Sequence, residues 1–199
     1  MYFYSIDKTS VAEYKDKGSR FVAYAYPLKN AEDFKKILLG LKKEHPKAVH
    51  HCFAYRIGTD GNNFRVSDDK EPSGSAGKPI LNAIDSRQLT NVLIVVVRYF
   101  GGTLLGVPGL INAYKSSAAL ALQLVPAIQY PIEINYQLQF NYTMMNEVMM
   151  IVKQYNCTVI KQESQLFNIL EIGIPKARLQ EALDKLKELH TVEIAVVSG

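Results

Sequence analysis

Cysteine is scarce in this chain of 199 residues, which contains only Cys52 and Cys157. Two thiols far apart in the sequence supply neither the disulfide framework of a small secreted domain nor a multi-cysteine zinc ribbon. This cysteine usage is typical of a protein from a reducing compartment.

Long hydrophobic runs are also missing. The apolar run at residues 92–97 has six residues and ends at Arg98, whereas a membrane-spanning helix needs about 20. The first residues, Met1–Lys8, lack the basic and apolar regions of a signal peptide. We therefore expect a cytoplasmic protein with no membrane segment.

The charges of the two signs nearly balance. Twenty-three Lys and Arg against 19 Asp and Glu give a net charge of +4, far below that of a polycation. No Gly-Lys pair is followed by Ser or Thr at the spacing of a Walker motif, which disfavours a nucleotidase or phosphotransferase. With 48% hydrophobic and 21% charged residues, the composition is that of an average globular protein.

The charge divides the chain into two parts. Up to Tyr130, 17 basic and 11 acidic residues give +6, and from Pro131 onward 6 and 8 give −2. Pro126 and Pro131 lie where the sign changes, and proline disfavours continued helix. We therefore predict two α+β domains, at residues 1–128 and 133–199.

The second domain has a readable order of elements. Residues 132–142 alternate as a half-buried strand, and Met145 to Tyr155 follow a helical stripe. Two further strands, a helix opened by Pro175 and a last strand at 192–197 complete βαββαβ, the order of a ferredoxin-like sandwich.

The first domain shows strands at 19–26, 49–57 and 89–97. Asn30 is placed to cap a helix that carries Phe34 and Leu41. Residues 60–79 are rich in Gly, Asp, Ser and Pro and indicate a long unstructured loop, of a kind that is often functional. An apolar helix is expected from Pro108 to Leu124.

The strongest local feature is the turn Arg98–Gly109, which joins a buried strand to this helix. Its four glycines, Gly101, Gly102, Gly106 and Gly109, let a ligand approach the backbone amides, and a helix N-terminus attracts anions. Arg98 would add a cation that grips phosphate. A tight corner with no ligand is an equally good interpretation of the same glycines.

Other residues permit other chemistry. Asp68, Asp69 and Glu71 supply enough carboxylates for Mg²⁺, although a solvated turn is the simpler interpretation. His50 and Cys52 share one face of a strand, as a two-ligand set or a Cys–His nucleophilic pair would require. A third metal ligand is missing from this pattern.

Four ordered motifs resemble the IMPACT/YigZ family. They are Lys17-Gly18-Ser19-Arg20-Phe21, residues 50–56, residues 68–81 and residues 97–102 followed by Gly109-Leu110 and Ala113-Tyr114. The resemblance implies a first domain like one of a ribosomal protein of the small subunit and a second like one of elongation factor G. In this family, as the resemblance implies, eukaryotic relatives restrain a stress-responsive translation kinase, and nucleic-acid or ribosome binding is the usual proposal for bacterial members.

The resemblance also implies a functional surface and no demonstrated catalytic residue. This surface comprises His50, Asp68, Asp69, Glu71, Pro72, Gly74, Arg98, Tyr99, Gly101 and Gly102. The sequence departs from the family at Lys70, where Gly is usual, and at Leu104 and Asn112, where Lys and Arg are common. The last two changes remove cations beside the turn.

These observations predict a non-enzymatic, translation-linked regulator without a cofactor or metal. Its partner would be RNA, the ribosome or a translation factor, with the second domain as a protein-docking module. We expect the ligand at Arg98, Tyr99, Gly101, Gly102, Gly106 and Gly109, supported by Lys78 and Arg56. An enzyme for a small anionic metabolite or peptide at the same pocket, and a purely protein-binding adaptor, are the alternatives.

Overall fold

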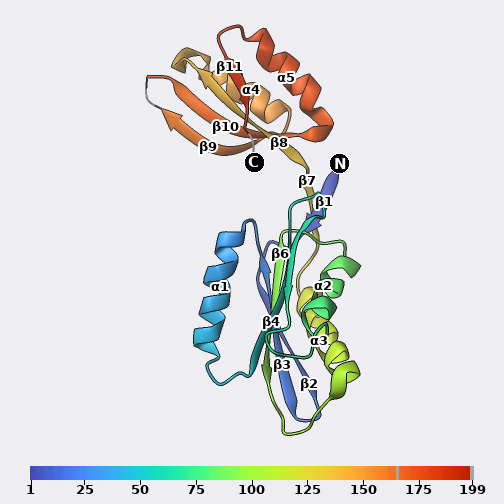
Figure 1. Cartoon of the computed structure of the whole chain (residues 1–199). Coiled ribbons are helices and arrows are strands. Elements are labelled where there is room, and N and C mark those ends of the chain that lie inside the picture. The colour runs from blue at the N-terminus through green and yellow to red at the C-terminus, as the bar shows by residue number, and fades with distance from the viewer. Residues whose placement is uncertain (165, 198–199) are drawn as a thin grey trace. The chain divides into compact units, whose positions relative to one another are not determined.

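The computed structural model describes residues 1–164 and 166–197 of the chain. The protein has two compact α+β units (Figure 1). The N-terminal unit is Phe3–Tyr130, and the C-terminal unit consists of the chain from Pro131 onward together with Met1–Tyr2. No helix in the described residues is long and apolar enough to cross a membrane.

A five-stranded antiparallel sheet forms the centre of the N-terminal unit. Its order is β2-β3-β6-β4-β5, and its members are β2 (Ser10–Asp16), β3 (Ser19–Pro27), β6 (Val92–Tyr99), β4 (His50–Ile57) and β5 (Asn63–Ser67). β3 and β4 run parallel, with β6 between them and antiparallel to both. The helix α1 (Ala31–Glu44) makes the β3–β4 connection.

Helices cover both faces of this sheet (Figure 1). Because successive strand residues point to opposite faces, Ile94 and Val96 of β6 pack with α2 (Gly77–Ser86) and α3 (Gly106–Gln123). Val95 and Val97 pack with α1 on the other face. The strand therefore reads as a continuous apolar run, since both its faces are buried.

The predicted start of α1 is confirmed. The side chain of Asn30 accepts hydrogen bonds from the amides of Glu32, at 3.1 Å, and Asp33, at 2.9 Å. These two acidic residues also lie at the positive end of the helix dipole.

The expectation of an unstructured loop at residues 60–79 is wrong. The segment contains β5 as the edge strand of the sheet, and α2 begins at Gly77. β5 is exposed along most of its length, so it shows no buried stripe. The short strands β1 (Tyr2–Ser5) and β7 (Ile128–Pro131), which pair with each other, also lack a periodic signal.

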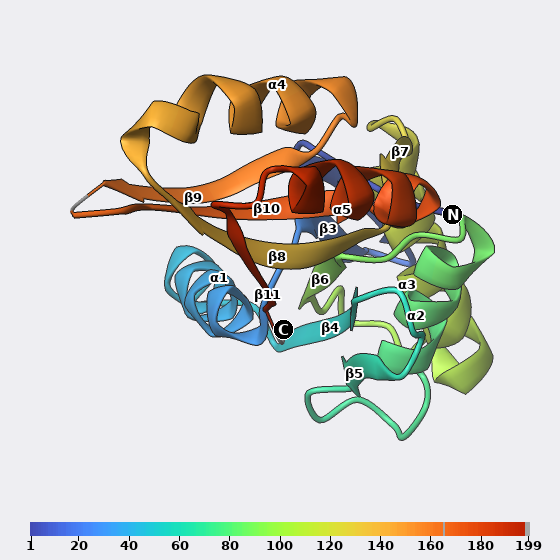
Figure 2. The ribbon, with the colours of Figure 1, turned by 90° about the horizontal axis from the view of Figure 1, so that it is seen from above.

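The C-terminal unit has the predicted βαββαβ order. It comprises β8 (Glu133–Phe140), α4 (Met145–Gln154), β9 (Thr158–Ser164), β10 (Asn168–Pro175), α5 (Leu179–Glu188) and β11 (Glu193–Val196), with short 3-10 turns before each helix. The strands are antiparallel in the order β11-β8-β10-β9. Both helices lie on one side of this sheet (Figure 2), where Leu138, Val148 and Leu186 are buried together.

The loop between β5 and α2 holds two residues with left-handed backbone. Asp69 has a φ of 38° and Lys70 a φ of 73°, a conformation in which the β-carbon of an L-residue meets the following carbonyl. Lys70 is exposed, so its side chain adds no buried contact in return.

We expect Lys70→Gly to raise the free energy of unfolding by about 1 kcal/mol, because glycine adopts this φ without steric cost. The matched control is Lys29→Gly, at an exposed position where φ is not positive, and it should lower stability. Urea unfolding of both variants measures the difference. Equal loss of stability in the two would contradict the assigned strain.

Candidate functional site

Two helices of the N-terminal unit begin at one edge of its sheet. β5 and β6 each pair antiparallel with β4, so they run in the same direction and end at the same edge. The chain then enters α2 after β5 and α3 after β6. We call this edge, with the loop 68–76 and the turn 100–105, the helix-start edge.

The Asp68 side chain caps the N-terminus of α2. Its Oδ1 accepts from the amides of Ala76, at 3.0 Å, and Gly77, at 2.8 Å. Its Oδ2 accepts from the amide of Gly74 at 2.9 Å. A carboxylate that satisfies three amides at the positive end of a helix is a cap, so Asp68 has a structural role here.

The carboxylate of Glu71 is the centre of a buried polar cluster. Its Oε1 lies 2.6 Å from Arg98 Nη1 and accepts from the Tyr114 hydroxyl at 2.7 Å. The Nε2 of His50 lies 3.7 Å from the same oxygen. The side chains of Arg98 and Glu71 are 6% and 4% exposed, so this ion pair is almost fully removed from water.

Strand alternation explains why these groups meet. His50 and Cys52 lie on the face of β4 that packs against α2 and α3, and Arg98 continues the same face of β6. Tyr114 enters from α3, between the buried apolar residues Leu110, Ala113 and Ala118 of that helix. The loop between β5 and α2 then brings Glu71 over this face.

Cys52 is a hydrogen-bond donor inside the cluster. Its Sγ lies 3.0 Å from the Asp68 carbonyl oxygen and 3.3 Å from the Tyr114 hydroxyl oxygen. Burial raises the pKa of the Cys52 thiol far above its usual value, and nearby carboxylates add to the shift. The thiol is therefore protonated, which does not suit the nucleophilic alternative.

Burial also raises the pKa of Tyr114, with smaller contributions from Cys52 and Glu71. The hydroxyl therefore stays protonated and donates a hydrogen bond to Glu71. Tyr114 is the member of the cluster that sequence reasoning missed, although a tyrosine within an apolar helical stripe was a usable signal.

His50 and Asp69 hold the loop to β4. The Nδ1 of His50 lies 2.7 Å from the carbonyl oxygen of Asp69, so this nitrogen carries the proton. The Asp69 Oδ2 accepts from the His51 amide at 2.6 Å. Because the three acids have separate partners, they do not converge, and no set of three metal-ligating side chains occurs in the described residues.

Arg98 is not an exposed phosphate ligand, contrary to expectation. It is buried against the rings of Phe21 and Phe100, with its guanidinium carbon 5.4 Å and 5.8 Å from their centroids. Its Nε has no hydrogen-bond partner among residues 1–164 and 166–197. Glu71 already neutralises the charge.

The expectation that Arg56 and Tyr99 lie at the Gly-rich turn is also wrong. Arg56 pairs with Val92 at the other end of β6, and its guanidinium forms two hydrogen bonds with Asp85. Tyr99 points to the α1 face, where its hydroxyl lies 2.7 Å from His45 Nδ1. Neither side chain faces the Gly-rich turn.

The remaining predicted residues do lie at the helix-start edge. Gly74, Pro72 and Lys78 are exposed in the loop and the first turn of α2. Gly102 and Gly106 are exposed and have positive φ, of 87° and 69°. Gly109 lies in the first turns of α3.

The Gly-rich turn is held against the hairpin between β2 and β3. The amide of Gly101 donates to Ser19 Oγ at 3.1 Å. A β-carbon at Gly101 would collide with the backbone of Gly18 and Ser19. The hairpin turn that carries Lys17 is thereby placed beside the Gly-rich turn.

The start of α3 differs from the start of α2. Leu105 occupies the cap position, and within the described chain no side chain caps the helix and no acidic residue lies in its first turn. No Asp or Glu occurs anywhere from residue 86 to residue 132. This helix therefore offers amide donors and a positive dipole end without a protein anion.

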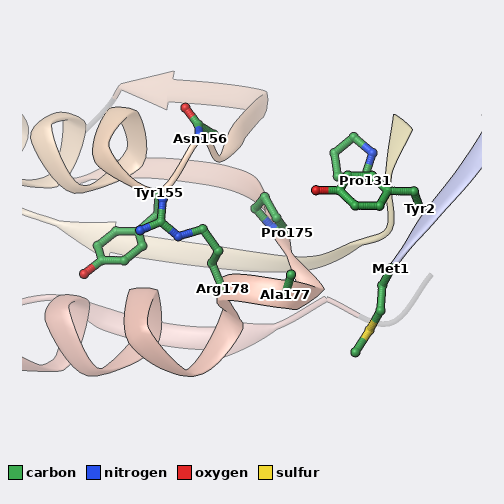
Figure 3. Close-up of a pocket in the computed structure, with 8 residues that line it drawn as sticks. All are labelled: Met1, Tyr2, Pro131, Tyr155, Asn156, Pro175, Ala177 and Arg178. Atoms are coloured by element: carbon green, nitrogen blue, oxygen red, sulfur yellow. The ribbon is translucent and has the colours of Figure 1, made fainter. Parts of the chain in front are cut away.

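A cavity of about 250 Å³ occurs in the C-terminal unit (Figure 3). Arg178 lies on its wall, with the guanidinium carbon 4.7 Å from the centre of the Tyr155 ring and Nη1 bonded to the Gln154 carbonyl at 3.2 Å. These contacts already engage the guanidinium, and the cavity contains none of the family-motif residues.

Comparison with known proteins identifies the family to which the chain belongs. Residues 17–122 match the model of the Impact N-terminal domain. An IMPACT family member of Haemophilus influenzae is 35% identical over 196 residues, 97% of this chain and 95% of that protein. The chain belongs to the IMPACT family.

Two further relatives cover most of the chain. The IMPACT family member YigZ of Escherichia coli is 34% identical over 175 residues, 86% of this chain and 85% of that protein. A crystal structure of a hypothetical protein superimposes with a TM-score of 0.76 at 28% identity, covering 99% of this chain and 98% of that chain. The family expected from the motifs is thus confirmed.

Removal of one partner of the buried ion pair should cost far more than removal of both. Glu71→Leu leaves the Arg98 charge uncompensated and should lower the free energy of unfolding by about 3–5 kcal/mol. Adding Arg98→Met should recover most of this loss. The control Glu13→Gln breaks the exposed pair with Arg20 and should lower the free energy of unfolding by less than about 1 kcal/mol. Urea unfolding measures each change, and additive losses of stability from the Glu71 and Arg98 substitutions would contradict the pairing.

The two thiols should differ in reactivity. Cys157 is partly buried, and desolvation raises its pKa to about 11, so we expect slow labelling by a disulfide reagent at pH about 8. Cys52 should react after unfolding. A Cys157→Ser variant should therefore give no rapid native-state labelling, and a fast reaction in that variant would argue for an accessible Cys52 thiolate.

Proposed function

We propose that this protein is a non-enzymatic, translation-linked regulator that binds RNA, free or within the ribosome, at the helix-start edge. The phosphate backbone would contact the amides at the start of α3 and the neighbouring lysines. In this proposal Arg98 supports the site from inside and does not contact the ligand.

The unequal capping of the two helices is the observation that carries this proposal. Asp68 fills the N-terminus of α2, whereas the exposed start of α3 receives no side-chain cap from the described residues. An external anion would satisfy those amides and interact favourably with the helix dipole.

The distribution of charge at the edge supports an anionic ligand. Asp68, Asp69 and Glu71 all accept hydrogen bonds inside the fold. Lys17, Lys70 and Lys78 are exposed and take part in no ion pair with the described residues. The acids are thus neutralised by the fold while the lysines face solvent.

The link to translation rests on the family. Its eukaryotic members, as the resemblance implies, restrain a translation kinase, and its first domain is like one of a ribosomal protein. RNA therefore fits this exposed surface and the family's link to translation better than a small metabolite does.

The enzyme alternative has less support from the geometry. It requires His50 as an acid or base beside metal-binding carboxylates. Instead, Nδ1 of His50 is engaged by the Asp69 carbonyl, and the carboxylates serve a helix cap, an amide and an arginine.

A charge-restoring variant tests the proposal. Leu104, at the turn, is 84% exposed, and Leu124, just after the other end of α3, is 64% exposed. We expect Leu104→Lys to tighten RNA binding several-fold and to steepen the dependence of log K on log salt by about 0.7–0.9. Leu124→Lys adds the same charge some 20 residues away, about 30 Å along a helix, and should change both quantities less.

The measurement is fluorescence anisotropy of labelled RNA at about 50 and 200 mM salt. Lys17→Ala should weaken binding in the same assay, because it removes a cation beside the turn. Absence of wild-type binding, or identical effects of the two added lysines, would refute the proposed site.

A further inference from the structure

Phe100 is an exposed aromatic residue directly after β6, at the entry to the Gly-rich turn. Its side chain is 50% exposed. The guanidinium carbon of Arg98 lies over the ring, 5.8 Å from its centroid. Glu71 fixes that guanidinium through the buried ion pair, so the ring has a rigid support on one side and solvent access on the other.

The position of Phe100 connects it to the proposed anion contacts. Gly101 and Gly102 follow it directly, and the uncapped start of α3 comes a few residues later. The hairpin with Lys17 is held to Gly101 by the contacts of Gly18 and Ser19. An aromatic face, amide donors and cations thus occur together at one edge.

We propose that Phe100 is a stacking platform for an unpaired base, and that the ligand of the helix-start edge is single-stranded RNA. This inference rests on the proposed function and specifies its substrate class. A ring stacks on any base whose face is free, while phosphate contacts position the strand. In a duplex the base faces are already stacked on one another, so the platform would remain empty.

Charge complementarity favours a nucleic acid over an apolar peptide at this platform. The exposed cations of the helix-start edge, Lys17, Lys70 and Lys78, take part in no ion pair with the described residues, and no acidic residue occurs from residue 86 to residue 132. A polyanion with exposed π-faces matches both properties of the edge, whereas an apolar segment would match the ring alone.

The chain contains a matched control for Phe100. Phe64 is also 50% exposed, and the guanidinium carbon of Arg56 lies 5.3 Å from its ring centroid. Phe64 pairs with Arg56 in the sheet, near the end of β4 remote from His50. Like Phe100, it is half exposed and has an arginine over its ring, but it does not lie beside the Gly-rich turn.

The experiment compares single-stranded RNA of about 15 nucleotides with the same sequence as a duplex. Full-length protein is titrated by fluorescence anisotropy with wild type, Phe100→Ala, Phe100→Tyr and Phe64→Ala. We expect the single strand to bind more tightly, Phe100→Ala to lose about fivefold or more of that affinity, and Phe100→Tyr to retain it. Phe64→Ala should stay close to wild type, and thermal unfolding checks that each variant is folded.

The outcomes separate this inference from the proposed function. Equal binding of strand and duplex with no effect of Phe100→Ala, while Leu104→Lys still tightens binding, would overturn the platform alone. Loss of ribosome co-sedimentation in Phe100→Ala without loss of RNA affinity would assign the ring to a protein partner and also overturn it. No binding of either RNA would overturn both proposals.

Discussion

The ion pair between Glu71 and Arg98 fixes the geometry of the whole helix-start edge. It joins the loop before α2 to the central strand β6, and Tyr114 adds α3 to the same carboxylate oxygen. Removing two charges from water is costly, and the cost is offset because the two charges are close partners and Glu71 also accepts a hydrogen bond from Tyr114. His50 and Asp69 hold the same loop to β4, so the ion pair adds β6 to the elements that position it.

The internal contacts of the acidic side chains decide which groups remain available to a ligand. Asp68, Asp69 and Glu71 are engaged in a helix cap, a contact with a backbone amide and an ion pair. What remains outside is a set of lysines, an uncapped helix start and an aromatic ring. The acidic motif and the glycine motif are therefore complementary, because one builds the scaffold and the other forms the outer surface.

Periodicity predicted the elements that are buried on a regular face. The apolar strand at 92–97 and the βαββαβ order could be predicted in this way, and the cap at Asn30 from the residue type that helix N-caps prefer. β5 and β1 were not, because their residues are largely exposed or the strands too short for a pattern. Arg98 was misjudged since its carboxylate partner lies 27 positions away, in a loop whose path no local pattern specifies.

The close approach of Gly18 and Gly101 has a consequence for recognition. Two peptide backbones in direct contact leave no side-chain rotamers between the hairpin and the turn. The backbone of Lys17 is therefore held close to the amides of the turn by this contact before any ligand arrives. The amides of the turn and the backbone of Lys17 would thus already be positioned for the phosphates of an RNA strand. The protein backbone would lose little conformational entropy on binding.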